Sequence, residues 1–299
     1  MESFLSYTVS GLEAGTFYAL VALGYTLIYG IIRLINFAHG DLTMVGSYIG
    51  WSVLVPLGLG KLPLALAIAV AAVVAMLVCA VINVSILNLA YKPLLSKSLL
   101  AILITALGMS IVLQNSALLI FGPQVNVYPI LFSSAGIDLV GVHVTFAQLT
   151  FFLIGIALMV ALYTFIQFTT LGVAMRALAI DHDAARLMGI DVDRTIAVAF
   201  VLGAILAAAA GVMIGLYYTQ INFFMGFVLG LRAFTAAVLG GIGNIPGAMA
   251  GGLLIGLLQA YCAGYLASNW QDVFVFGVLI AVLVIKPSGL FGERIAERM

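Results

Sequence analysis

Charged side chains are scarce in this 299-residue sequence, where Asp, Glu, Lys and Arg together contribute 7%. Soluble domains carry about 25% charged residues, so this shortage excludes an ordinary soluble protein. Hydrophobic residues instead make up 65% of the chain, and the mean hydropathy is +1.27. A helix of about 20 apolar residues crosses the hydrocarbon core of a bilayer, and the chain contains many such runs. We therefore expect an all-α polytopic membrane protein, with residues 1–299 forming a single transmembrane domain.

The sequence also lacks the common motifs of hydrolytic, metal and nucleotide sites. Its two cysteines, Cys79 and Cys262, both lie in apolar runs, so they predict neither a disulfide framework nor a metal site. No H-E-x-x-H or G-x-S-x-G motif occurs, and Gly60-Lys61 lacks the other residues of a P-loop. We therefore expect no enzyme activity, no cofactor and no nucleic-acid partner. Energy for uphill transport would come from an ion gradient or from another subunit.

Long apolar segments divide the chain into eight or nine crossings of the membrane. The second and seventh segments are interrupted by polar residues, and the last is short for a full span, which leaves the count open. The predicted segments are Thr8–Ile28, Ile31–Val55, Leu62–Ala90, Ser98–Phe121, Thr145–Phe168, Thr195–Thr219, Phe223–Ile242, Gly247–Ala267 and Asp272–Ile285.

Basic residues indicate the orientation, because Lys and Arg accumulate in the cytoplasmic loops of membrane proteins. With nine crossings, an external N-terminus and a cytoplasmic C-terminus, only Lys61 and Arg232 would not be cytoplasmic. Arg232 would then snorkel to the outer interface or pair inside the bundle. The other basic residues would all be cytoplasmic: Arg33, Lys92, Lys97, Arg176, Arg186, Arg194, Lys286, Arg294 and Arg298.

Two connections are longer than simple turns. Residues 122–143 are expected to form an external loop that offers a surface for a partner outside the cell. Residues 169–194 are expected to form a cytoplasmic loop, and this segment concentrates charged residues. Apolar residues recur there at helical spacing: Val173, Ala177, Ile180, Ala184 and Leu187. We interpret this loop as a helix that docks a cytoplasmic partner; a surface helix packed against the bundle is the alternative.

The second apolar segment contains polar groups near its centre, where residues 36–41 read NFAHGD. An Asp within a span costs about 2.5–3.5 kcal/mol on insertion scales and normally faces protein or a water-filled cavity. An ionisable residue on either side of Gly40 indicates locally unwound backbone, as in broken transporter helices. The alternative is that these residues cap two helical pieces at a membrane boundary. The residues predicted to lie beside a translocation pathway for a zwitterionic or polar solute are Asn36, Phe37, His39, Gly40 and Asp41.

The seventh segment ends in a glycine-rich run, GGIGNIPG, over residues 240–247. Gly and Pro at this density are typical of a tight turn between closely packed helices. We expect a cytoplasmic turn here, and lining of the pathway is the alternative. The residues of this turn are Gly240, Gly241, Gly243, Pro246 and Gly247.

Three segments together resemble a known transporter family. They are LINFAHGDLTMVGSYIG (Leu34–Gly50), LGVAMRALAIDHDAARLMGIDVDR (Leu171–Arg194) and LRAFTAAVLGGIGNIPGAMAGG (Leu231–Gly252). In this order and at this chain length, they are similar to the membrane permease of branched-chain amino acid ABC importers, the high-affinity leucine/isoleucine/valine type. The resemblance extends over nearly the whole chain.

Part of the second segment resembles the motif by which importer permeases contact their ATPase subunits. Asp183-Ala184-Ala185 followed by Gly189 is similar to the core E-A-A-x-x-x-G of that motif. Asp183 replaces the usual Glu, and the Leu-Pro that often ends the longer motif is absent. The resemblance assigns coupling to the ATPase to Arg176, Asp183, Ala184, Ala185 and Gly189.

The resemblance implies a machine of several subunits. Two related permeases form the pore, two cytoplasmic ATPases drive it, and a periplasmic binding protein delivers the amino acid. The chain would be a multi-pass permease subunit of a bacterial or archaeal cytoplasmic (inner) membrane. Importers of urea and short amides and broader amino acid systems remain alternatives for the solute. The residues alone also leave open an ion-coupled secondary transporter that uses His39 and Asp41, and a membrane scaffold or receptor.

Overall fold

The computed structural model describes residues 2–59, 63–94, 99–129, 132, 135–139 and 142–292. Its α-helices are α1 (Glu2–Ile32), α2 (Ala38–Leu54), α3 (Leu64–Ile86), α4 (Leu99–Phe121), α5 (Phe146–Phe168), α6 (Thr170–Ile180), α7 (His182–Leu187), α8 (Val192–Tyr218), α9 (Met225–Gly240), α10 (Ile245–Tyr265) and α11 (Gln271–Ile285). Shorter helical turns are η2 (Leu87–Tyr91), η3 (Lys92–Leu94) and η4 (Ser268–Trp270). The strands are β1 (Asn126–Val127), β2 (Gly136–Leu139), β3 (Val142–Thr145) and β4 (Gln220–Ile221).

The helices confirm the prediction of an all-α polytopic membrane protein. Among the described residues, seven helical segments are long and apolar enough to cross a membrane, and they contain α1, α3, α4, α5, α8, α10 and α11. α2 has 17 residues and α9 has 16, so each is short for a full span. These two helices fall in the second and seventh predicted segments, the ones that the sequence shows as interrupted. The count of eight or nine crossings stays a prediction.

The bundle has buried inner helices and an apolar outer layer. In the apolar windows of these helices, 83% of α1 residues and 72% of α8 residues are buried, against 6% for the segment that contains α11. α2 packs mainly against α8, α3, α9 and α4 and is also mostly buried. The outer helices present large exposed side chains such as Leu77 on α3 and Leu119 on α4. Such surfaces suit lipid tails, which are as apolar as these side chains.

Small residues bring the inner helices close together. A Cβ built on Gly256 of α10 would lie 2.2 Å from the backbone nitrogen of Gly15 on α1. A Cβ on Gly211 of α8 would lie 2.1 Å from the carbonyl oxygen of Thr43 on α2. The hydrophobic effect gives little driving force for helix association in lipid, so van der Waals contact between closely packed backbones stabilises the bundle instead.

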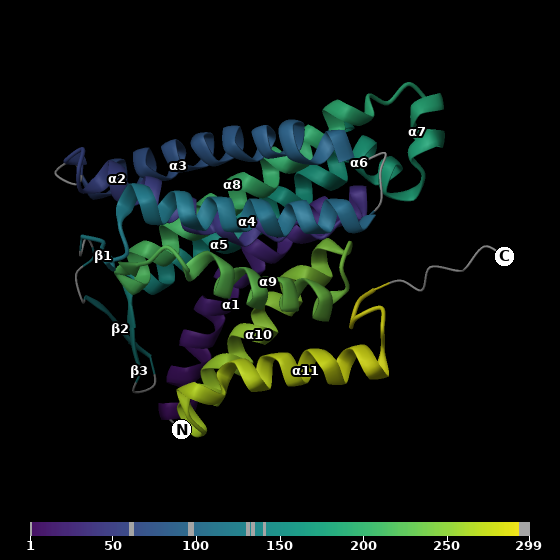
Figure 1. Ribbon diagram of the computed structural model, residues 1–299. Helices are drawn as coiled ribbons and strands as arrows, with labels where there is room; N and C mark the ends of the chain where they lie inside the picture. The colour runs from purple at the N-terminus through teal and green to yellow at the C-terminus, as the bar shows by residue number, and fades with distance from the viewer. Residues whose placement is uncertain are drawn as a thin grey trace.

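The two ends of the bundle differ (Figure 1). One end carries the N-terminus and the strands, where β1 pairs with β4 and β2 pairs with β3, both antiparallel; we call it the strand end. The opposite end carries α6 and α7, and the segment after α11 returns there to the turn between α9 and α10; we call it the α6–α7 end. The N-terminus and the last described residues therefore lie at opposite ends, as an odd number of crossings requires.

The strand end is closed by part of the predicted external loop. Tyr128 is 1% exposed, and its hydroxyl donates a hydrogen bond of 2.5 Å to the carbonyl oxygen of Ser47 on α2. Burial raises the pKa of this hydroxyl above its usual value, so it stays a neutral donor. The Trp51 indole donates to the carbonyl oxygen of Val127 at 2.9 Å. Among the basic residues used to orient the chain, Lys61, Lys97, Arg294 and Arg298 lie outside the described residues.

Candidate translocation site and coupling surface

The polar segment predicted to interrupt the second span lies at the junction of α1 and α2. α1 continues to residue 32, residues 33–37 are non-helical, and α2 begins at Ala38. Arg33 has a φ of +57°, a left-handed conformation that is uncommon for residues with a side chain. The second predicted segment is therefore a helix preceded by a short non-helical stretch.

Gly40 lies in the first turn of α2, so the predicted unwinding at this residue is wrong: the unwound residues precede it. Gly40 instead allows α2 and α9 to pack closely. A Cβ built on Gly40 would lie 2.5 Å from the Cα of Gly230 and 2.7 Å from the carbonyl oxygen of Gly226, both on α9. A side chain on Gly226 would in turn meet Asp41. The start of α2 therefore requires small residues on both helices.

Asp41 is fully buried and is held by two polar residues of α4. Its Oδ2 accepts a hydrogen bond of 2.5 Å from the Ser110 hydroxyl, and the Gln114 amide donates to both carboxylate oxygens at 3.2 and 3.3 Å. No salt bridge to Asp41 occurs within the part of the chain that the structure describes. Ser110 is the central residue of α4, so α2 begins at mid-depth, where its positive N-terminal end favours an acidic side chain.

His39 is fully buried in a notch between α1 and α8. A Cβ on Gly24 would lie 2.1 Å from its Nε2, and a Cβ on Gly203 would lie 3.3 Å from its Cε1. The Tyr25 ring meets the imidazole edge to face at 4.9 Å. Within the described residues neither ring nitrogen has hydrogen-bond geometry with a partner, although the Val21 backbone lies close. His39 is thus a buried polar group without a structural hydrogen bond to explain it.

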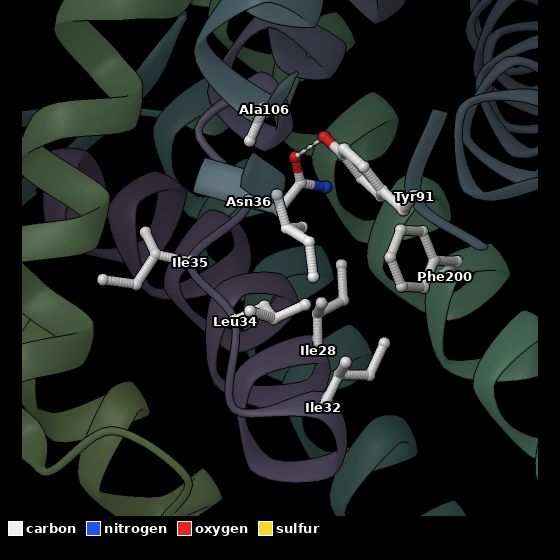
Figure 2. Close-up of a pocket in the computed structure, with 9 residues that line it drawn as sticks. Ile28, Ile32, Leu34, Ile35, Asn36, Tyr91, Ala106 and Phe200 are labelled. Carbon is white, nitrogen blue, oxygen red and sulfur yellow. Dashed lines mark hydrogen bonds between the residues drawn. The ribbon is translucent and has the colours of Figure 1, made fainter. Parts of the chain in front are cut away.

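Asn36 and Phe37 lie just before α2. The Tyr91 hydroxyl donates to Asn36 Oδ1 at 2.7 Å, while Asn36 Nδ2 has no partner among the described residues (Figure 2). The Phe37 ring packs against Phe234 of α9 at 6.1 Å. Asn36 lines a cavity of about 10 Å³, which is room for about one water molecule and too little for an amino acid. The cavity is lined by Ile28, Ile32, Leu34, Ile35, Asn36, Tyr91, Ile102, Ala106 and Phe200.

A larger cavity of about 670 Å³ lies at the α6–α7 end. Tyr29 and Arg33 border it from the α1–α2 junction, Ala179 from α6, and Asn244 from the turn between α9 and α10. Arg33 is the charged side chain among the lining residues that the structure describes. The volume lies in the range of small-molecule pockets, so this end of the bundle has space for a solute.

The predicted coupling helix consists of two helices, α6 and α7, separated by Asp181. The Asp181 side chain caps α7 by accepting hydrogen bonds from the backbone nitrogens of Asp183 and Ala184 at 2.9 and 3.0 Å. The two helices pack against the protein through Met175, Leu178 and Ala185, which are all buried. Large apolar side chains remain exposed on the same helices and just after α7: Val173, Ile180, Leu187 and Met188. The segment therefore both packs on the bundle and presents an apolar surface.

The residues assigned to coupling occupy different environments. The Arg176 guanidinium donates to the carbonyl oxygen and the side-chain oxygen of Gln167, at the end of α5. Ala185 is 3% exposed. Asp183, Ala184 and Gly189 are exposed, and Gly189 ends α7 with a φ of +81° and open space around its Cβ position. Asp183, Ala184 and Gly189 are thus accessible to a partner, while Arg176 and Ala185 serve contacts within the chain.

The glycine-rich run forms the short turn between α9 and α10. Gly241 and Gly243 have φ values of +103° and +95°, which a side chain would strain. Asn244 caps α10 by accepting from the backbone nitrogen of Gly247 at 2.9 Å, and Pro246 lies in the first turn of α10. A Cβ on Gly240 would lie 2.0 Å from the carbonyl oxygen of Gly247. The geometry of this turn therefore depends on its glycines.

Comparison with known proteins places this arrangement in a family. Residues 7–283 match the family described as branched-chain amino acid transport system / permease component. The chain belongs to this permease family. It is 40% identical to the high-affinity branched-chain amino acid transport system permease protein LivH of Escherichia coli, over 99% of this chain and 98% of that protein. It is 42% identical to the corresponding protein BraD of Pseudomonas aeruginosa, with the same coverage, and 30% identical to a probable LivH of Methanocaldococcus jannaschii, over 91% and 88%.

The permease contains polar residues that the sequence reasoning does not single out. Ser110 and Gln114 bind Asp41, and their spacing of four residues within an apolar segment is a weak signal for a shared polar face. Glu13 is 2% exposed in α1. An acidic residue inside the first predicted span is a clear signal that could have identified it.

Proposed function

We propose that this permease is a pore-forming subunit of an ATP-driven importer for branched-chain amino acids. The observation that carries the proposal is the match over almost the full length to relatives named for high-affinity branched-chain amino acid transport, at 40–42% identity. The subunit would lie in the cytoplasmic membrane with the strand end outside and the α6–α7 end in the cytoplasm. This orientation agrees with the bias of basic residues toward the predicted cytoplasmic loops.

The proposed machine requires partners, because the sequence has no P-loop of its own. One of two cytoplasmic ATPases would dock on α6 and α7, where exposed apolar side chains such as Ile180 and Leu187 support a protein interface. A second, related permease would complete the pore. A periplasmic binding protein would deliver the amino acid to the strand end, where residues 122–129 are anchored on α2 through Tyr128.

ATP binding would close the two ATPases and move α6 and α7. Because Ala179 of α6 borders the large cavity, that movement would change its volume and so the access from the cytoplasm. Asn36, His39 and Asp41 would line the solute's path in a conformation where α2 moves away from its neighbours. The burial of these polar groups inside a membrane bundle supports this role. Burying them costs free energy, and such residues usually mark a solute pathway.

Reconstitution tests the proposed function. The permease is co-expressed with a second permease and two ATPases from the same genome, purified and placed in proteoliposomes with the binding protein. We expect uptake of radiolabelled leucine that requires both ATP and the binding protein. Uptake by this chain alone, driven by an ion gradient, would instead show a secondary transporter. ATP-dependent uptake of urea or short amides without leucine would show that the proposed solute is wrong.

A further inference from the structure

Glu13 is an acidic side chain buried in the outer half of the bundle, below the strand end. Glu13 is 2% exposed, and neither of its carboxylate oxygens has a hydrogen-bond partner within the described residues. Tyr217 of α8 and Gln148 of α5 lie beside it without meeting hydrogen-bond geometry. An unpaired buried carboxyl group costs folding free energy, so its presence requires a reason.

Arg232 lies in a hydrogen-bonded group of side chains near the same end. Its Nε donates to Asp272 at 2.8 Å, and one terminal nitrogen contacts the Tyr18 hydroxyl at 3.3 Å. The Tyr18 hydroxyl donates to Gln259 at 2.5 Å, and Gln259 donates to Gln271 at 3.0 Å. The guanidinium is thereby fixed between α1, α9, α10 and α11.

Glu13 and Arg232 share aromatic neighbours. Tyr218 lies within electrostatic reach of both Glu13 and Arg232, and the rings of Tyr217 and Tyr218 meet edge to face at 4.8 Å. Tyr217 also packs against Phe17 at 5.8 Å. The region therefore combines a carboxylate, a guanidinium and aromatic rings at the end of α8, immediately before β4.

The acidic and basic groups in this region are unequally paired. Asp272 already pairs with Arg232, so Glu13 has no cationic partner among the described residues. The Asp272 side chain is 49% exposed and that of Arg232 is 17% exposed. A partner that is half in solvent can be replaced by another carboxylate more easily than a buried one, because water compensates its release.

We propose that Glu13 and Arg232 form the outer recognition site for the two charged ends of a zwitterionic α-amino acid. When the strand end opens, the Glu13 carboxylate binds the ammonium group, with Tyr217 and Tyr218 offering ring faces to the cation. The Arg232 guanidinium binds the carboxylate with two parallel hydrogen bonds in place of Asp272. This site lies directly below the surface where the binding protein would deliver the solute, and the inference rests on the proposed import of amino acids.

Replacement of Glu13 by Gln tests the inference in the reconstituted complex. Glu13→Gln keeps the shape and hydrogen-bonding capacity of a neutral acid but removes the negative charge. We expect the maximal rate of leucine uptake to fall about tenfold, because an ammonium group loses its charged partner. The apparent KM, which the binding protein sets, stays unchanged, and the number of ATP molecules hydrolysed per leucine rises. Glu2→Gln, the same change at the exposed start of α1, leaves uptake as in wild type.

Wild-type behaviour of the Glu13 variant would contradict the inference. If Glu13→Gln transports at the wild-type rate and coupling ratio, Glu13 acts as a neutral structural group and the inference is overturned. If that variant does not assemble, Arg232→Lys and Arg232→Gln decide, with stability in detergent measured for both. Loss of coupling in Arg232→Gln at normal stability, with retention in Arg232→Lys, supports the site, and equal coupling in the two overturns it. Absence of leucine uptake in the wild-type complex would reject the proposed function itself.

Discussion

The Asp41 carboxylate accepts a hydrogen bond of 2.5 Å from the Ser110 hydroxyl, which joins the first turn of α2 to the centre of α4. Within the described residues this carboxylate has hydroxyl and amide donors but no cation. In a bundle surrounded by lipid, such a bond holds two helices together and also keeps a charged group compatible with the interior.

Replacement of Ser110 by Ala is expected to destabilise the permease by about 1 kcal/mol, because Asp41 loses its shortest hydrogen bond. Thermal unfolding in detergent measures the effect. Ser85→Ala is the matched control, since Ser85 is exposed and its hydroxyl donates to the carbonyl oxygen of Val81 in its own helix. Equal stability of the two variants would show that the Asp41–Ser110 contact contributes nothing.

Gly40→Ala is expected to destabilise the contact between α2 and α9. The new methyl group would lie 2.5 Å from the Cα of Gly230, so the helices must separate, at a cost of about 1–3 kcal/mol. Gly108→Ala on α4 is the control, because no described residue outside the neighbouring backbone of α4 comes within 4 Å of its Cβ position, and Ala favours a helix. Unfolding midpoints in detergent compare the two. A Gly40→Ala protein as stable as wild type contradicts the close approach of these helices.

The sequence predicts the helices well and the break between α1 and α2 poorly. Apolar runs of about 20 residues must become helices in a bilayer, because lipid cannot satisfy an exposed backbone. Hydropathy does not tell where the backbone unwinds inside a largely apolar region, because it reports the transfer of side chains into lipid and not the backbone conformation. The non-helical residues 33–37 are set by contacts from other helices, such as the hydrogen bond from Tyr91 to Asn36.

The candidate site is only partly predictable from the sequence, which identifies its polar residues but not their contacts. Asn36, His39 and Asp41 are visible as polar residues in an apolar run, so the sequence identifies them. Their partners are not visible, because contacts such as that between His39 and Gly24 join distant parts of the chain. Ala185 shows the converse: the motif marks it for docking, but its burial depends on how α7 packs.

Gly189→Glu is expected to uncouple ATP hydrolysis from uptake while the permease still inserts. Gly189 is exposed beside α7, so the new side chain enters the proposed ATPase interface. The control is Gly58→Glu, because Gly58 has a similar φ of +69° and an equally open Cβ position, but precedes α3 at the strand end. Leucine uptake and ATPase co-purification are measured for both. Normal uptake in Gly189→Glu at normal expression argues against docking there.

Ala185→Asp is unsuitable for this test, because Ala185 is buried in the permease itself.

Single cysteines test whether residues 36–41 approach the solute path. Asn36→Cys, Ala38→Cys and Asp41→Cys are made in a protein whose native cysteines are replaced by alanine. All three positions are buried in the present conformation, so we expect slow labelling by water-soluble thiol reagents in this state. Trapping ATP on the partner ATPases should change the labelling rate if α2 lines the path. Constant labelling from the cytoplasm, indifferent to nucleotide and solute, would identify a cap at the membrane boundary instead.

His39→Gln separates ATP-driven transport from proton-coupled transport. Gln retains hydrogen-bonding groups but cannot titrate near neutral pH, so it removes any proton relay at this position. In an ATP-driven importer, where His39 lies between Gly24 and Gly203 and lines the path without relaying protons, the variant should keep most of its uptake and a nearly unchanged pH profile. Leucine uptake between pH 5.5 and 8, about the range in which histidine ordinarily titrates, provides the measurement. A collapse of uptake at every pH, in a variant that assembles and hydrolyses ATP normally, would mean that the imidazole carries protons and that ATP is not the sole energy source.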